Sequence, residues 1–265
     1  MPRRVHRASS PYNPIENYGI IGDLSTVALV GMDGSIDFMC FPEFDSPTIF
    51  AALLDHRKGG SFKLAPMMDE AHAKQLYLPE SNILLSRFLS EEGVAEISDF
   101  MPITELGHAH AIVRRAKSIR GDIRFRMSCA PRFDYGRAKH RVQKKRNEVI
   151  FVSQGADKSV IRFRSEVPLK IKDGDATAEF RLRSGECAAF VLEDAHERGE
   201  SPSAGPDYVS DSFKETMNFW QQWVQHSQYR GRWREMVNRS ALTLKLLTSA
   251  RYGSIVAAPT FALPE

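Results

Sequence analysis

Alternation of apolar and polar residues dominates the first 193 positions of the chain. Between residues 122 and 129 every second residue is apolar, namely Ile123, Phe125, Met127 and Cys129. A period of two places one face of a strand on a core and the other in water. The pattern recurs over residues 160–164 and 178–183, and Glu91-Glu92-Gly93 joins two more apolar stretches as a hairpin. Many short strands without intervening helices predict a mainly β fold, an antiparallel β-sandwich of the super-sandwich type, over residues 1–193.

A tight hairpin and a short helix are predicted near the N-terminus. Asp33-Gly34 lies between the apolar runs 26–30 and 36–41. Asp-Gly in that position is a strong hairpin signal because Gly accepts positive φ at little steric cost. Asp45-Ser46-Pro47 then offers a cap residue followed by a proline suited to a first helical turn. We therefore expect residues 49–54 to form a short helix that Gly59-Gly60 ends.

The pattern changes after Glu193, where residues 194–207 are polar and rich in Gly, Pro and Ser, as in a surface linker. Ser212 and Glu215 have the spacing of a capping box, which predicts a helix over 212–227. Apolar residues on one face of it are Phe213, Met217, Trp220 and Val224. A second helix is expected over 232–249, with a stripe formed by Trp233, Val237, Ser240, Leu244 and Leu247. Residues 194–265 are thus predicted to be a C-terminal helical linker, distinct from the sandwich.

Composition indicates an ordinary folded protein. The chain has 265 residues, of which 42% are hydrophobic and 26% charged. No apolar segment approaches the ~20 residues that a membrane helix needs, and no apolar run follows the basic N-terminus, so we expect a cytoplasmic protein. Cys40, Cys129 and Cys187 lack a metal-binding spacing and are expected to be buried thiols, and His108 and His110 are expected at the surface.

A basic run between Arg114 and Arg146 raises the question of nucleic-acid binding. It holds thirteen Lys or Arg residues against Asp122 and Asp134, with aromatic residues between them. The net charge of the whole chain is only +3, however, and Arg124 and Arg126 are the solvated alternates of a predicted strand. Lys144-Lys145-Arg146 is interpreted as a solvated hairpin tip, and no nucleic-acid or membrane partner is expected.

Several ordered blocks resemble one protein family. They are PIENYGIIGD at 14–23, VGMDGSIDF at 30–38, CFPEFDSPTIFAALLD at 40–55, APRFDYGR at 130–137 and LTLKLLTSARYGSIVAAPTFALPE at 242–265. Together they resemble the N-terminal domain that precedes the catalytic barrel in bacterial glucoamylase-like and trehalase-like enzymes of glycoside hydrolase family 15. One departure is Phe38, where the family commonly has tryptophan.

The resemblance implies that the chain lacks catalytic residues. An inverting glycosidase needs two carboxyl groups about 6.5–9.5 Å apart, and in this family both glutamates lie in the α/α barrel that would follow Glu265. Asp33 is explained by its turn and Asp45 by a helix cap. The resemblance places Phe38, Phe44 and Asp45 beside the sugar pocket, and it implies no cofactor and no metal.

Three hypotheses stay open. The first is the non-catalytic N-terminal domain of an enzyme that hydrolyses α-glucosidic bonds in maltooligosaccharides or trehalose, with its barrel in cis or on a partner chain. The second is a self-sufficient carbohydrate-binding, protein-binding or structural module, and the third is a nucleic-acid module. An apolar helical face needs a cover, so the C-terminal helices are expected to self-associate or recruit a partner when the barrel is missing.

Overall fold

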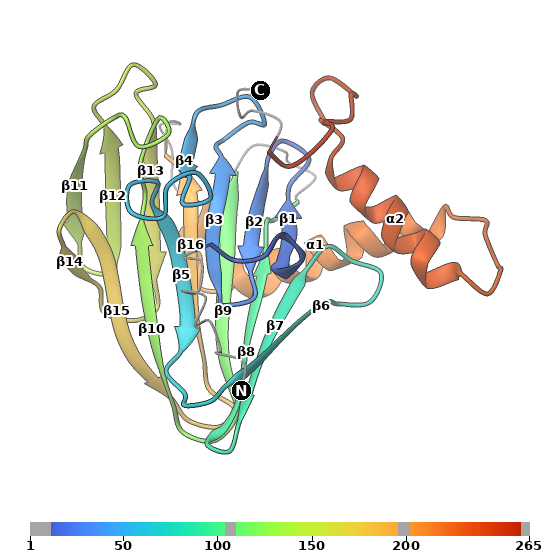
Figure 1. The fold of residues 1–265 in the computed structure, drawn as a ribbon, viewed down its shortest axis with the longest axis horizontal. Helices are drawn as coiled ribbons and strands as arrows, with labels where there is room; N and C mark the ends of the chain where they lie inside the picture. The colour runs from blue at the N-terminus through green and yellow to red at the C-terminus, as the bar shows by residue number, and fades with distance from the viewer. Residues whose placement is uncertain (1–11, 104–109, 196–201, 261–265) are drawn as a thin grey trace, which may run out of the picture.

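The computed structural model describes residues 12–103, 110–195 and 202–260, and within them sixteen strands form two antiparallel sheets (Figure 1). Sheet A has the order β1 (Tyr18–Gly22), β2 (Val27–Gly31), β3 (Ser35–Cys40), β5 (Ser61–Pro66), β10 (Ile123–Ala130), β15 (Asp175–Leu182) and β14 (Lys170–Lys172), with β4 (Thr48–Phe50) paired to β3. Sheet B has the order β11 (His140–Lys145), β12 (Glu148–Ser153), β13 (Val160–Ser165), β16 (Cys187–Asp194), β9 (Ala111–Arg120), β8 (Gly93–Phe100), β7 (Leu84–Ser90) and β6 (His72–Tyr77).

The main core lies between the two sheets, as the alternating pattern predicts. The inward residues of β10 (Ile123, Phe125, Met127 and Cys129) are at most 2% exposed. Phe62 of sheet A meets Phe163 of sheet B edge to face, with ring centroids 5.4 Å apart. The predicted antiparallel β-sandwich is therefore confirmed. Of the three cysteines, Cys40 and Cys129 are buried as expected, whereas Cys187 is exposed at the start of β16.

The hairpin around Gly34 is confirmed, and the short helix after it is wrong. Gly34 has φ +81° in the turn between β2 and β3. Residues 48–50 form β4, in which Phe50 pairs with Met39 and Thr48 with Cys40. Thr, Ile and Phe favour a strand wherever a neighbouring strand is available, and β3 provides one. A turn follows, with Leu54 N donating to Ala51 O at 2.9 Å.

Two helices follow the sandwich. The first, α1 (Tyr208–Gln225), begins four residues before the predicted capping box, so Ser212 is a buried residue within the helix and not its cap. Phe213 and Met217 pack on the outer face of sheet B, while Trp220 and Val224 join the second helix in a smaller core. The predicted apolar stripe of α1 is thus confirmed. A 3-10 turn (Pro202–Ala204) precedes the helix, and another (Ile15–Asn17) precedes β1.

The second helix, α2 (Arg234–Leu246), extends away from the sandwich in Figure 1 and is shorter than the predicted 232–249. Its buried residues are Asn238, Leu242 and Leu246. Most of the predicted stripe lies on a different face, where Trp233 and Leu244 are exposed, whereas its last member, Leu247, packs in the small core. Neither helix is long and apolar enough to span a bilayer, as far as residues 12–103, 110–195 and 202–260 tell.

Candidate functional site at one end of the sandwich

Three segments from distant parts of the chain meet at one end of the sandwich, and we call them the rim. They are the turn 23–26 between β1 and β2, the loop Phe41–Pro47 after β3, and the C-terminal segment 247–256. Leu24 O accepts a hydrogen bond from Ala250 N at 2.7 Å, which ties the turn to the C-terminal segment. The Thr26 hydroxyl donates to Cys40 O at the start of the loop. The rim therefore brings the N-terminal family-like blocks, between residues 14 and 55, into contact with the C-terminal block at 242–265.

The loop Phe41–Pro47 closes on itself without starting a helix, so the predicted cap at Asp45 or Ser46 is wrong. Phe41 N donates to Pro47 O at 3.3 Å across its base, and the Phe41–Pro42 peptide bond is cis. Ser46 Oγ accepts a hydrogen bond from Glu43 N at 3.1 Å, which makes a turn instead of a cap. The loop is therefore held in shape by its own backbone and Ser46.

The three residues that the resemblance places near a sugar pocket have different surroundings. Phe38 is fully buried in β3. Phe44, 7% exposed, packs with Leu24, Trp220 and neighbouring residues of the small core under the helices. Asp45 is exposed at the tip of the loop. Burial and, after it, the charge of Asp45 raise the pKa of the Cys40 thiol to about 12. Of the three, only Asp45 presents its side chain to solvent.

His110 contributes an ion pair to the rim, which corrects its expected surface role. Its Nδ1 lies 2.8 Å from Asp23 Oδ2, and the two side chains are only 23% and 5% exposed. The hydrogen bond to Asp23 raises the pKa of His110; burial opposes this, while the charges of Asp23, Glu43 and Asp194 support it. The Asp23 carboxylate also accepts hydrogen bonds from Ser25 N and Thr26 N, each at 3.0 Å. His108 lies outside the described residues.

A strained turn at 133–137 lies against the rim. Three successive residues have left-handed backbones, namely Asp134 (φ +50°), Tyr135 (φ +56°) and Gly136 (φ +78°). Such conformations are costly for residues other than Gly and need support from their surroundings. Tyr135 N donates to Thr48 Oγ1 at 3.1 Å, directly after the Phe41–Pro47 loop. The family-like block APRFDYGR is thus packed beside the family-like block CFPEFDSP.

Two acids near the hairpin serve structural roles. Asp33 Oδ1 accepts from Ser35 Oγ at 2.7 Å, and Asp33 Oδ2 from Lys63 Nζ at 2.6 Å. Burial works to raise the pKa of Asp33, yet the hydrogen bonds from Lys63 and Ser35 lower it below its ordinary value. Asp37 accepts from the Tyr18 hydroxyl at 2.7 Å, and burial together with this bond raises the pKa of Tyr18. Both carboxylates are therefore engaged, as the turn interpretation of Asp33 predicts.

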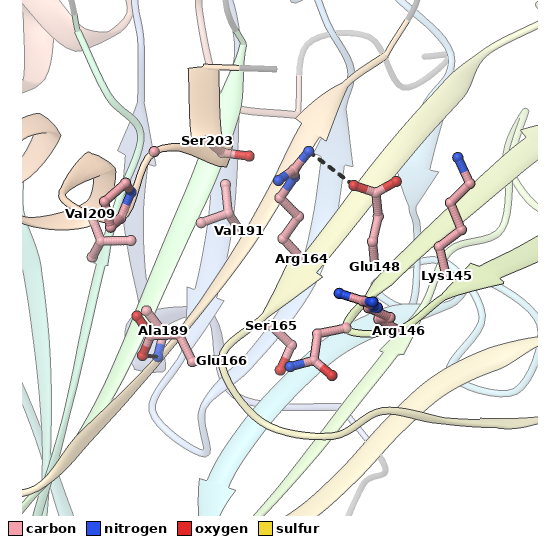
Figure 2. Close-up of a pocket in the computed structure, with 13 residues that line it drawn as sticks. Lys145, Arg146, Glu148, Arg164, Ser165, Glu166, Ala189, Val191, Ser203 and Val209 are labelled. Carbon is pink, nitrogen blue, oxygen red and sulfur yellow. Dashed lines mark hydrogen bonds and ion pairs between the residues drawn. The ribbon is translucent and has the colours of Figure 1, made fainter. Parts of the chain in front are cut away.

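A hollow of about 340 Å³ lies on the outer face of sheet B, where the β11–β12 turn approaches the start of α1 (Figure 2). Arg164 points at Glu148 and binds its Oε2 at 2.9 Å. Glu166 Oε2 accepts a hydrogen bond from Ala189 N at 2.8 Å. Both carboxylates that line the hollow are engaged, and its described lining includes no aromatic ring on which a sugar could stack. The hollow is therefore a weaker candidate than the rim.

The chemistry of the rim favours contact over bond cleavage. The buried carboxylate of the rim, Asp23, binds His110 and accepts hydrogen bonds within the turn 23–26, so it is not available as a base that activates water. Within residues 12–103, 110–195 and 202–260, no three His, Cys, Asp or Glu side chains come together as metal ligands. Sequence reasoning missed the His110–Asp23 pair, because its members are 87 positions apart and His110 belongs to none of the family-like blocks.

Comparisons with known proteins agree with the family-like blocks. The family model described as "Trehalase-like, N-terminal" matches residues 2–193. A trehalase of Thermoplasma volcanium is 32% identical over 96% of this chain, and one of Mycolicibacterium smegmatis is 29% identical over 97%. The chain spans 41% of the length of each. A bacterial glucoamylase solved with acarbose has the same fold over 92% of the chain and 42% of its own, with a TM-score of 0.64 and 9% identity.

Proposed function

Since this chain belongs to the trehalase-like N-terminal domain family, we propose that it acts as the non-catalytic N-terminal domain of a family 15 type glycoside hydrolase. The observation that carries the proposal is that the matched trehalases are more than twice as long as the region they share with this chain. The catalytic α/α barrel then comes from the same polypeptide or from a partner chain. The division into a sandwich (1–193) and a helical linker (194–265) belongs to this proposal.

The proposed substrates are α-glucosides, either trehalose or maltooligosaccharides. The names of the relatives favour the first, and the fold shared with a glucoamylase is compatible with the second. We assign the exposed Asp45 to the mouth of the sugar pocket that the barrel forms. Phe44 positions the loop from below, and Phe38 supports it from within β3. A cytoplasmic location fits the three free thiols.

Glucose release tests the proposal. The 265-residue chain alone is expected to release no glucose from trehalose, maltose or maltotetraose above buffer at any pH, because both catalytic carboxyl groups lie elsewhere. The coding sequence extended past codon 265 is expected to yield an active hydrolase. Turnover by the chain alone that Asp37→Asn or Asp45→Asn abolishes would overturn the assignment of a non-catalytic role.

A self-sufficient binding module is the second candidate, and the self-contained sandwich core favours it. Residues from both sheets bury one another without help from any other chain. Absence of a barrel-coding region from the adjacent DNA, in frame or displaced, would favour this candidate over the first. In that case we expect the C-terminal helices to mediate self-association, which sedimentation would detect.

A further inference from the structure

Tyr135 has a backbone conformation that is unfavourable for a tyrosine. Its φ of +56° lies in the left-handed region, and so does that of Asp134 before it, at +50°. Among the described residues, no other two neighbouring non-glycine residues share this conformation. Gly adopts it readily and Asn more easily than most residues, whereas a residue such as Tyr is strained there. Tyr135 therefore destabilises its own turn, and we expect its side chain to have a role that offsets this cost.

The turn 133–137 is held by backbone contacts and by Phe133. The Phe133 side chain is fully buried, and its carbonyl accepts hydrogen bonds from Gly136 N at 3.1 Å and Ala138 N at 3.2 Å. Tyr135 contributes its backbone N–H, which donates to Thr48 Oγ1 at 3.1 Å. Within the described part of the chain, the Tyr135 ring belongs to none of the three hydrophobic clusters. Gly or Asn at this position could make the same backbone bond, so these contacts do not require the ring.

The Tyr135 ring lies beside a charged pair at the surface. The guanidinium carbon of Arg137 is 5.4 Å from the centroid of the ring. Arg137 Nη2 is 2.6 Å from Asp134 Oδ1, and the two side chains are 70% and 30% exposed. Exposed ion pairs and exposed cation–π contacts stabilise a fold only weakly. These contacts place the ring next to the ion pair, but they do not account for the strain of two left-handed residues.

The three side chains are complementary to a sugar. A pyranose has apolar C–H faces and pairs of neighbouring hydroxyl groups. The tyrosine ring provides an apolar face with a polar tip, while Asp134 provides acceptors and Arg137 provides several donors. An anionic ligand fits poorly, because Glu43 and Asp45 of the neighbouring rim loop add negative charge to that of Asp134. A neutral carbohydrate is therefore the ligand class that this surface favours.

We propose that Tyr135 is a sugar-binding residue of the rim, whose ring stacks on a glucose unit of the α-glucoside while Asp134 and Arg137 bind its hydroxyl groups. This inference rests on the proposed function and adds a specificity-determining residue to its sugar pocket. The position of the turn supports it, because Tyr135 N donates to Thr48, the residue directly after the loop that carries the exposed Asp45. The strain is retained because Gly or Asn, which would relieve it, has no ring to offer the sugar.

Tyr135→Gly tests the inference, because it removes the ring and relieves the backbone strain together. The variant is made in the protein extended through the barrel-coding region, with trehalose and maltotetraose as substrates. We expect its Tm to equal or exceed that of the natural extended protein. The KM for the better substrate should rise about tenfold with kcat changed less than about twofold, because the ring binds substrate and transition state alike. A residue that only supported the fold would instead lower Tm and leave KM unchanged.

Two further variants separate the ring from the backbone. Glu70→Gly is the matched control for strain relief, since Glu70 is exposed and has φ +49°. It follows the far end of β5, whereas Ser61 at the other end pairs with Ala130 just before the turn. Glu70→Gly should not lower Tm and should leave KM unchanged. Tyr135→Phe keeps the ring and should keep KM within about twofold of the natural value.

Three results would overturn the inference: an unchanged KM in Tyr135→Gly, a lower Tm in the same variant, or a rise in KM as large in Tyr135→Phe as in Tyr135→Gly. Each leaves the proposed function intact when the extended protein hydrolyses α-glucosides.

An extended protein without hydrolysis, or adjacent DNA without a barrel-coding region, refutes the proposed function instead. The effect of maltotetraose on Tm then decides the inference, measured on the extended protein or on the 265-residue chain. A rise in Tm of the natural protein that is absent from Tyr135→Gly supports the sugar contact. An equal effect on both proteins, or none, refutes it.

Discussion

Arg114 Nε lies 2.8 Å from Asp99 Oδ1, and neither side chain is exposed at all. Both residues belong to sheet B, on the neighbouring strands β9 and β8. The other guanidinium nitrogens reach across the core to sheet A, where Nη2 donates to Gly34 O at 2.8 Å and Nη1 donates to Phe62 O. Apolar contacts between sheets are non-directional, so this one side chain provides directional bonds that fix how the sheets face each other.

Replacing Arg114 with Leu should strongly destabilise the fold. The substitution leaves the Asp99 carboxylate buried without its partner, which costs about 3–5 kcal/mol of unfolding free energy. Urea denaturation measures the loss. Arg126→Ala is the control, because Arg126 pairs with Glu179 at an exposed position where the expected loss is below about 1 kcal/mol. If both variants lose the same unfolding free energy, the buried pair contributes no more to stability than the exposed one.

The His110–Asp23 pair should make stability depend on pH. Its hydrogen bond raises the pKa of His110 in the folded protein, so folding favours the protonated imidazole. This contribution is complete below the ordinary histidine pKa of about 6.5 and disappears as pH rises through the folded-state pKa. The stability advantage of the natural chain over His110→Gln should therefore be larger at pH 5.5 than at pH 8.5.

An NMR titration of the His110 ring gives an independent check of the same pair. The imidazole of the natural chain should titrate above the ordinary histidine value. Asp23→Asn keeps the hydrogen-bond acceptor for the turn 23–26 and removes the charge, so it should bring the pKa of His110 down. A His110 pKa that Asp23→Asn leaves unchanged would contradict the role given to Asp23.

Gly34 should tolerate no side chain. Its φ of +81° disfavours any other residue, and a Cβ there would collide with the backbone carbonyl of Leu64. Gly34→Ala should therefore cost at least about 1 kcal/mol for the backbone alone, with the collision added. Gly185→Ala is the matched control, because Gly185 has φ +89° and open space around its Cβ position. If the two variants melt at the same temperature, the close approach to Leu64 has no energetic effect.

Substitutions at Phe44 and Asp45 should distinguish the residue of the rim loop that stabilises the fold from the residue that is exposed to solvent. Phe44→Ala removes a buried ring from the small core beneath the helices and should cost about 3–5 kcal/mol. Asp45→Ala changes an exposed residue and should stay within about 0.5 kcal/mol. Thermal unfolding measures both. A large loss from Asp45→Ala would show that its side chain supports the fold and would remove the reason to assign it to a ligand.

Sequence reasoning succeeded where the signal is local and failed where a distant strand decides. The strand around Met127 can be predicted because the alternation of apolar and polar residues lies within its own sequence and does not depend on the strand it pairs with. Phe50 lies in a stretch that reads as a helix start, and only the pairing with Met39 reveals a strand. Arg114 stands in the basic run, where no local pattern marks it as buried, yet its side chain is fully buried. Its partners Gly34 and Phe62 lie 80 and 52 positions away.

The strand order also determines when the sandwich can finish folding. Within sheet B, β16 lies between β13 and β9, although it is the last strand of the sandwich to leave the ribosome. Until residues 187–194 emerge, the meander β6–β9 and the hairpins β11–β13 each present an unpaired edge that only β16 can fill. Non-local pairing of this kind slows folding and leaves unpaired strand edges that can pair with other chains. Sheet B can therefore be completed only after nearly all of the sandwich has been synthesised. A chain truncated before Cys187 should form two separate parts of sheet B, each with an exposed edge, and should aggregate.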